Sequence, residues 1–150
     1  MVHTILNKAQ LARRIRRHVE MDLYDDSAMP AAGFAIYSLS DPRDIRHLRY
    51  VGQTTLPRRR FLQHLNTARL WLPEDRPWWV KSPKLRPLYD WIRLLYRDEF
   101  RLPTMVVRDW VSSVAEARVA ERSRIHECLA AGLPLLNAEA AVLSHQLPLL

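Results

Sequence analysis

Two short runs, close together in the chain, constrain the fold more than any other feature. The runs GFAIYSLS (33–40) and LRYVGQT (48–54) are rich in branched and aromatic residues and are bounded by the turn-forming segments DPRD and TTLP. They predict two strands of an antiparallel pair, with a connection that is long for a hairpin. A third run of similar composition, TMVVRDW (104–110), predicts a third strand.

Segments with helical periodicity follow these runs. Pro57 suits the first turn of a helix, and apolar residues then recur at helical spacing. The predicted core faces of three helices are Phe61, Leu65, Ala68 and Leu72; Leu85, Leu88, Ile92, Leu95 and Tyr96; and Val114, Ala117, Ile125, Cys128 and Leu129. The third helix is expected over 114–131, because Gly132 and then Pro134 are typical of a helix end.

The order of these segments predicts an α+β domain with a small, mainly antiparallel three-stranded sheet flanked by helices. Before it, apolar residues repeat at helical spacing among the arginines of residues 4–24 and predict a basic amphipathic helix. A chain of 150 residues suits a single core. We therefore expect an N-terminal helix and connection over 1–30, the main domain over 31–139 and a tail over 140–150.

Composition restricts the partners and the compartment. The net charge is +7, the pI is about 10.2 and arginine far outnumbers lysine, which favours the binding of phosphates. Simple solubility is the alternative explanation of the charge. No stretch approaches the roughly 20 apolar residues of a membrane span, the start is too charged for a signal peptide, and the single Cys128 cannot close an internal disulfide. These features predict a soluble, reduced, cytoplasmic protein.

The third predicted helix carries a carboxylate within its apolar face. Glu121 shares that face with Ala117 and Ile125, whereas Glu116 and Glu127 point away from it. An ionised carboxylate among apolar side chains is unfavourable unless a cation, a hydrogen-bond network or water satisfies it. Glu121 is therefore a candidate functional residue, and an ion pair with an arginine at the rim of the face is the alternative.

Four further residues are candidates for a functional site. Arg60 and His64 lie one turn apart along the edge of the first apolar helix face, where their side chains could project into a cleft. Tyr37 and Tyr50 lie in the first two predicted strands. Tyrosines in neighbouring strands fit either cross-strand packing or proton transfer.

A loop rich in proline, tryptophan and charged residues separates the first two of these helices. The segment WLPEDRPWWVKSPKLRP (71–87) predicts no regular element before Leu85. Its aromatic side chains could stack on bases, and packing in the core is the alternative for at least one tryptophan. With nearby arginines it supplies the candidate nucleic-acid contacts, which are Arg58, Arg59, Arg69, Trp78, Trp79, Lys81 and Lys84.

Several of these segments, taken in order, resemble the GIY-YIG nuclease family. The similarity covers about 33–137: AIY and YVG in the first two strands, RRRFLQH in the next helix, and ERSRIHECLAAGLPLLN at the end. Ala35 stands where the first motif of the family has glycine, and the span between the two tyrosines is slightly longer than usual, with the extra residues expected in a turn. The resemblance implies the fold of that family and hydrolysis of phosphodiester bonds without a covalent intermediate.

The resemblance also implies roles for individual residues. Tyr37 would take a proton from the attacking water, directly or through a relay, and Tyr50 would position phosphate or water. Because a phenol ordinarily has a pKa of about 10, Tyr37 would need a nearby cation such as Arg60 or the metal. Arg60 would stabilise negative charge on the scissile phosphate. His64 would share proton transfer or bind phosphate, and a residue that only caps the cleft is the alternative.

Two residues late in the chain complete the implied site. Glu121, at the start of ERSRI, matches the metal-binding glutamate of the family and would anchor Mg²⁺, or Mn²⁺ in its place. Asn137, in PLLN, matches an asparagine that closes the domain and would tie the chain end to the wall of the site. A turn asparagine is the alternative for Asn137.

We therefore expect a metal-dependent endonuclease that acts on nucleic acid, with double-stranded DNA as the favoured substrate. One alternative is a binding module on the same fold that holds nucleic acid or protein without catalysis. Another is a nuclease domain tethered through its N-terminal helix or its tryptophan-rich loop to a second copy of the chain or to a different protein.

Overall fold

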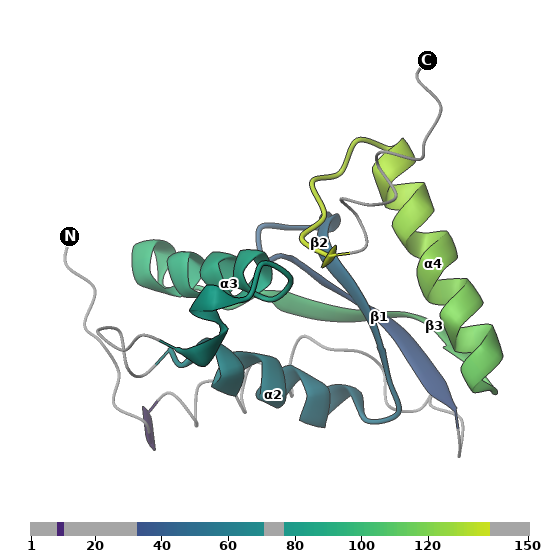
Figure 1. The fold of residues 1–150 in the computed structure, drawn as a ribbon, viewed down its shortest axis with the longest axis horizontal. Coiled ribbons are helices and arrows are strands. Elements are labelled where there is room, and N and C mark those ends of the chain that lie inside the picture. The colour runs from purple at the N-terminus through teal and green to yellow at the C-terminus, as the bar shows by residue number, and fades with distance from the viewer. Residues whose placement is uncertain (1–8, 11–32, 71–76, 139–150) are drawn as a thin grey trace.

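The central element of the fold is a three-stranded antiparallel sheet in the order β2-β1-β3 (Figure 1). The computed structural model describes residues 9–10, 33–70 and 77–138. Both strand pairs are antiparallel and helices flank the sheet, so the predicted α+β fold is confirmed. The elements are β1 (Phe34–Asp41), β2 (Asp44–Thr54), α2 (Pro57–Ala68), the short 3-10 helix η2 (Trp78–Lys81), α3 (Arg86–Glu99), β3 (Thr104–Val111) and α4 (Val114–Ala130).

The connection between β1 and β2 is much tighter than the sequence predicts. The strands pair as far as Asp41 and Asp44, so only Pro42 and Arg43 separate them. The Asp41 carboxylate accepts hydrogen bonds from the backbone N–H and the guanidinium of Arg43, which stabilises the turn. The register shifts twice near this end. The extra residues between the two motif tyrosines are therefore accommodated by irregular pairing inside the strand pair, and the expected long turn is wrong.

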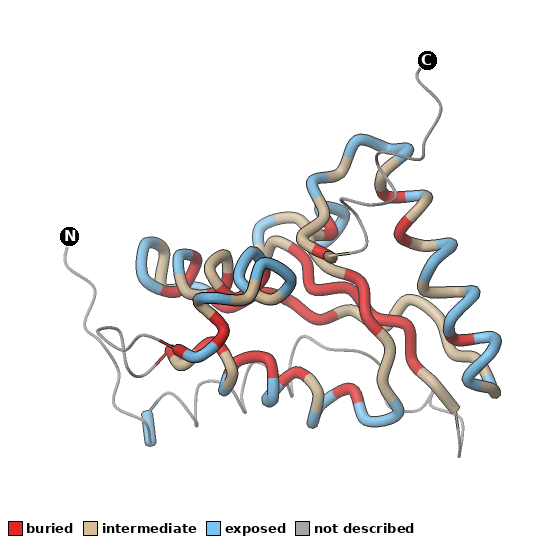
Figure 2. Tube along the Cα trace, viewed as in Figure 1, coloured by how far each residue is buried: buried red, intermediate tan, exposed pale blue. Residues whose placement is uncertain are grey.

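Both faces of the sheet are covered. Side chains alternate along β1, so that Tyr37 and Leu39 join a core with α2 and α3, whereas Ile36 joins a second core with α4. Figure 1 shows α2 and α3 on one side of the strands and α4 on the other. In Figure 2 the buried residues follow β1 and the inward faces of the helices. Cover on both faces explains why β1 is buried continuously from Ala35 to Ser40.

The helix limits follow local sequence. Pro57 opens α2, as predicted, and Arg69 ends it in a left-handed conformation with φ of 56°. At the start of α4 the side chain of Ser113 accepts a hydrogen bond from the backbone N–H of Glu116. Gly132, with φ of 77°, follows the end of α4, so the predicted end of this helix agrees to within one residue.

Most predicted core positions of the described helices are buried, with one clear exception. Val114 is 48% exposed because it is the first residue of α4, before the part of the helix that packs on the sheet. The tryptophan-rich segment also differs from expectation. It contains a regular element before Leu85, the single 3-10 turn η2, which directs Trp79 into the core.

Several predictions fall on residues that the structure does not describe. The N-terminal helix expected within 1–30 lies outside the described residues, apart from residues 9–10, which are helical. The tail expected over 140–150 also lies outside them. Leu72 also lies outside the described residues. Within the described part of the chain, no helix is long and apolar enough to cross a membrane.

Candidate active site

A histidine lies inside the core between two tyrosine hydroxyl groups. Nε2 of His64 lies 2.7 Å from the hydroxyl oxygen of Tyr37, and Nδ1 of His64 lies 3.1 Å from that of Tyr89. Only 1% of His64 is exposed, whereas the sequence predicted a position at the edge of the apolar face of α2. This correction has a physical reason. The two ring nitrogens are satisfied by tyrosines of β1 and α3, so the imidazole does not need water.

Tyr37 packs against Gly52, its cross-strand partner. A Cβ atom at position 52 would lie 2.5 Å from the hydroxyl oxygen of Tyr37 and 2.6 Å from its Cζ, which is closer than side chains tolerate. The glycine of the YVG motif therefore leaves room for the Tyr37 ring. This close approach lets the hydroxyl group of a strand residue reach His64 on α2.

Tyr50 lies beside both members of this buried pair. Its ring centroid is 6.3 Å from that of Tyr37 and 5.5 Å from that of His64. Tyr50 is two residues from the cross-strand partner of Tyr37, so the tyrosine contact is a diagonal one across the pair β1–β2. Because Tyr50 is only half-buried, it connects the pair with the protein surface.

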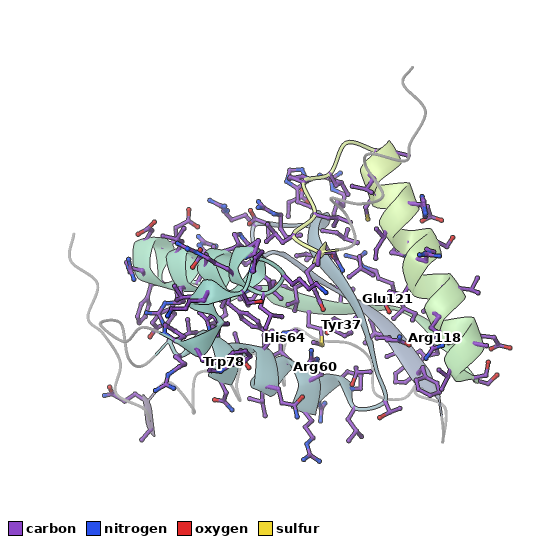
Figure 3. All side chains as sticks on the ribbon, in the orientation of Figure 1. Tyr37, Arg60, His64, Trp78, Arg118 and Glu121 are labelled. Atoms are coloured by element: carbon purple, nitrogen blue, oxygen red, sulfur yellow. The ribbon has the colours of Figure 1, made fainter. Side chains whose placement is uncertain are left out.

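Arg60 brings a positive charge to the cluster. It precedes His64 by one turn of α2 and is half-buried. Figure 3 shows Arg60 between α2 and the sheet, together with Tyr37 and His64. The neighbouring Arg58 and Arg59 are exposed.

Burial governs the ionisation of the pair. Burial raises the pKa of Tyr37 far above the ordinary value, Tyr50 raises it further, and the charge of Arg60 offsets only part of this increase. Burial and then the charge of Arg60 lower the pKa of His64 to about 3. At neutral pH, Tyr37 is therefore a protonated phenol and His64 a neutral imidazole. Arg60 alone does not make Tyr37 a base near neutral pH, because burial outweighs its charge.

Asn137 joins the end of the domain to β2. Its Oδ1 accepts a hydrogen bond of 2.9 Å from the backbone N–H of Val51, and its Nδ2 donates one of 2.7 Å to the carbonyl oxygen of Val51. The backbone N–H of Leu136 donates to the carbonyl oxygen of Arg49. Asn137 therefore ties the end of the domain to Val51, which directly follows Tyr50 in β2.

Glu121 approaches the sheet from α4. It lies on the helix face between Ala117 and Ile125, both of which are buried in the core shared with β1 and β2. Glu121 itself is half-buried. Figure 3 shows it directed from α4 toward the sheet, on the α4 side of the labelled residues Tyr37 and Arg60.

The carboxylate of Glu121 is chemically suited to a divalent cation that has few protein ligands. Among the described residues, no group of three or more His, Cys, Asp or Glu side chains is placed to hold a metal ion. Mg²⁺ commonly keeps several waters and binds through one or two carboxylates and substrate phosphates, so it does not need such a group. A single half-buried carboxylate such as that of Glu121 is chemically compatible with a cation of this kind.

The candidate nucleic-acid contacts differ in accessibility. Trp78 is 69% exposed, whereas Trp79 is fully buried and donates its Nε1–H to the carbonyl oxygen of Thr67 at 2.6 Å. The base-stacking role expected for Trp79 is incompatible with this burial. The exposed cations of the set are Arg58, Arg59, Lys81 and Lys84, and Arg69 is half-buried beside α2.

Tyr89 was not among the residues expected from the sequence. It lies on the buried face of α3, three residues before Ile92 and seven before Tyr96. The sequence signal is a tyrosine in a helical core face, since a buried hydroxyl group usually has a hydrogen-bond partner. The sequence does not identify that partner, because His64 belongs to a different helix.

Comparisons of the chain with protein-family models, with curated proteins and with solved structures found no match.

Proposed function

We propose that this protein is a Mg²⁺-dependent endonuclease of the GIY-YIG type that hydrolyses phosphodiester bonds in DNA. The observation that carries the proposal is the buried hydrogen bond between Tyr37 and His64, with the charge of Arg60 acting on both. This arrangement brings together a hydroxyl group, a proton acceptor and a phosphate-binding cation. All three come from the segments that resemble the family motifs.

Arg60 couples phosphate binding to the proton affinity of His64. In the protein alone its charge is one of the two causes of the low pKa of His64, after burial. A phosphate bound to Arg60 supplies negative charge that compensates the guanidinium, so the pKa of His64 rises when substrate is bound. The histidine therefore becomes a better proton acceptor at the moment when the reaction needs one.

Proton transfer then follows the hydrogen bond between Tyr37 and His64. The attacking water gives a proton to the oxygen of Tyr37, while the hydroxyl proton of Tyr37 moves to Nε2 of His64. The water oxygen forms a bond to phosphorus, the bond from phosphorus to the 3′ oxygen breaks, and that oxygen takes a proton from solvent. Tyr50, which lies beside both residues, orients the water or the phosphate.

Glu121 contributes charge stabilisation through a divalent cation. When bound, Mg²⁺, or Mn²⁺ in its place, stabilises negative charge on the phosphate and its leaving oxygen. Glu121 would hold this cation, with water and substrate oxygens as its other ligands.

The charge distribution supports a nucleic-acid substrate, and double-stranded DNA is the one that we propose. The chain has a net charge of +7, and exposed cations at Arg58 and Arg59 precede Arg60 at the start of α2. Contacts of this kind bind the backbone of a polyanion with little dependence on sequence.

Cleavage of supercoiled plasmid in Mg²⁺ tests the proposal on the wild type, Glu121→Gln and Glu127→Gln. Glutamine keeps the size of the side chain and removes the charge. Glu127 is the matched control because it lies on the same helix and its side chain is 65% exposed, so that its ion pair with Arg124, at 3.5 Å, contributes little to stability. Glu116 is less suitable, since its carboxylate accepts hydrogen bonds from Ser112 at the start of α4. We expect Glu121→Gln to cleave about 100-fold more slowly than the other two.

The other outcomes are equally informative. If the wild type does not cleave but still retards plasmid on a gel, the hydrolase proposal is contradicted and a binding module is favoured. Equal loss in Glu121→Gln and Glu127→Gln would contradict the role of Glu121 as metal ligand.

A further inference from the structure

The second nitrogen of His64 has a partner of its own on a third element of the fold. Nδ1 lies 3.1 Å from the hydroxyl oxygen of Tyr89, and the two rings lie 6.0 Å apart between centroids. Only 4% of Tyr89 is exposed, and its ring packs at 5.5 Å against the buried ring of Trp79. α3 and η2 therefore hold this hydroxyl group against the imidazole from the side opposite Tyr37.

The environment of Tyr37 decides which nitrogen of His64 carries the proton. The hydroxyl group of Tyr37 is buried, and a buried hydroxyl proton needs an acceptor. Arg60 cannot supply one, because a guanidinium has donors only. Among the described residues, the acceptor in hydrogen-bond contact with this hydroxyl is Nε2 of His64. A neutral imidazole that accepts at Nε2 carries its proton at Nδ1, which faces Tyr89.

The opposite tautomer, with the proton of His64 on Nε2, is unfavourable for two reasons. A proton on Nε2 would point at the Tyr37 oxygen, on which the positive charge of Arg60 also acts. With its proton on Nε2, His64 would also no longer accept the hydroxyl proton of Tyr37 at that nitrogen. The groups that face His64 are Tyr37 and Tyr50 from the sheet, Arg60 from α2 and Tyr89 from α3. Arg60 is the charged member of this set, and as a donor it occupies the Tyr37 oxygen. The proton of Tyr37 is therefore left to donate to Nε2 of His64.

We propose that Tyr89 is a positioning residue that accepts a hydrogen bond from Nδ1–H of His64 and thereby keeps Nε2 free to accept the proton of Tyr37. The side chain of Thr67 also acts on the Tyr89 hydroxyl group, and a threonine hydroxyl can either donate to it or accept its proton. The catalytic consequence rests on the proposed function, because it matters only if Tyr37 passes its proton to His64. The tautomer itself does not depend on any activity.

The tautomer is measured by long-range ¹H–¹⁵N correlation spectroscopy on full-length protein labelled with ¹⁵N-histidine at neutral pH. His64→Gln identifies the signals of His64 among those of the six histidines. We expect a protonated Nδ1 and an unprotonated Nε2 in the wild type. A protonated Nε2 in the wild type overturns the proposal.

Tyr89→Phe then tests the contribution of the hydroxyl group, with Tyr96→Phe as the control because it removes a hydroxyl from another buried tyrosine of α3. We expect Tyr89→Phe to lower the Nδ1-protonated fraction of His64 and Tyr96→Phe to leave it unchanged. An unchanged tautomer in Tyr89→Phe overturns the proposal, as expected for a tyrosine that only fills space.

Kinetics separate this proposal from the proposed function. If the wild type cleaves plasmid, we expect Tyr89→Phe to lower kcat about 10- to 100-fold with little change in KM, because DNA binding does not involve this buried hydroxyl. An unchanged kcat overturns the positioning role. If the wild type does not cleave, the proposed function fails, while the two spectroscopic results still decide whether Tyr89 sets the tautomer.

Discussion

The hydroxyl oxygen of Tyr37 lies 2.5 Å from the position that a Cβ atom of residue 52 would occupy, so Gly52 is required for the observed position of Tyr37. The two residues are directly paired across β1 and β2. The same hydroxyl group is hydrogen-bonded to His64, which leaves the Tyr37 ring little freedom to move away from residue 52. The geometry of the candidate site therefore depends on a residue that has no side chain.

We expect Gly52→Ala to displace Tyr37, to lower the free energy of unfolding by about 1–3 kcal/mol and to abolish cleavage. Gly132→Ala is the control: nothing lies within 4 Å of its added Cβ, but its φ of +77° makes alanine strained. This control should lose about 1 kcal/mol of stability and keep its activity. Denaturant unfolding and plasmid cleavage measure both effects. Equal cleavage by the two variants would show that Tyr37 does not need its observed position.

The depressed pKa of His64 should make the protein less stable in mild acid. The pKa is about 3 in the folded protein and about 6.5 in an unfolded chain. Between these values the unfolded chain takes up a proton that the folded protein excludes. The free energy of unfolding should therefore fall by about 1.4 kcal/mol per pH unit on acidification, and this contribution is fully present above pH about 6.5.

Urea unfolding at several pH values between 7 and 4 measures this dependence in the wild type and in His64→Gln. The variant should be less stable at pH 7, because it loses buried hydrogen bonds. Its free energy of unfolding should depend less on pH than that of the wild type, by up to about 1.4 kcal/mol per pH unit, the value for one proton. If the two slopes are the same, His64 is not buried in its neutral form.

Arg60 and Arg59 are neighbours on α2 with different environments, since Arg60 is half-buried and Arg59 exposed. We expect Arg60→Ala to slow cleavage at least about 100-fold, because it removes charge stabilisation at the phosphate. Arg59→Ala should cause less than about a tenfold loss, which low salt restores, because it weakens only backbone attraction. Equal losses that low salt does not restore would contradict the assignment of Arg60.

Arg60→Ala also gives a prediction that does not depend on cleavage. Because the charge of Arg60 is one cause of the low pKa of His64, its removal should raise that pKa. An NMR titration of His64 in wild type and variant measures the change. A lower or unchanged pKa would mean that the two residues are not electrostatically coupled, and the coupling of phosphate binding to proton uptake would then fail.

Trp78 and Trp79 should respond in opposite ways to alanine. Trp78→Ala removes an exposed ring and should leave stability nearly unchanged, while it weakens nucleic-acid binding by about 1–3 kcal/mol if the ring stacks on a base. Trp79→Ala removes a fully buried ring and should lower the free energy of unfolding by about 3–5 kcal/mol. Unfolding curves and a fluorescence binding assay with single-stranded and duplex DNA separate the two effects. Unchanged affinity in Trp78→Ala would remove it from the proposed contacts.

The sequence predicted the elements well where the signal is local. The strand runs around Tyr37 and Tyr50, the start of α2 at Pro57 and the end of α4 near Gly132 are all present. The helical phase also placed Glu121 between buried residues of α4. These features depend on periodicity and on the backbone preferences of proline and glycine, which a short window of residues contains.

Predictions failed where distant residues decide. The turn between β1 and β2 closed at Pro42 and Arg43 because pairing within the sheet absorbs the extra residues. The local sequence also did not tell which tryptophan packs in the core: Trp79 does so, and Thr67, on α2, offers a carbonyl oxygen to its indole N–H. Neither outcome can be read from the local pattern, because both depend on partners supplied by another element.

The order of amino acids predicts which residue types the candidate site can use and which strands and helices carry them. The position of His64 between Tyr37 and Tyr89 follows from the packing of those elements. The same packing keeps His64 a neutral imidazole and Tyr37 a protonated phenol, because a pKa depends on the water excluded and on the charges nearby. In this protein, strands and helices far apart in the chain exclude that water, and Arg60 supplies the charge.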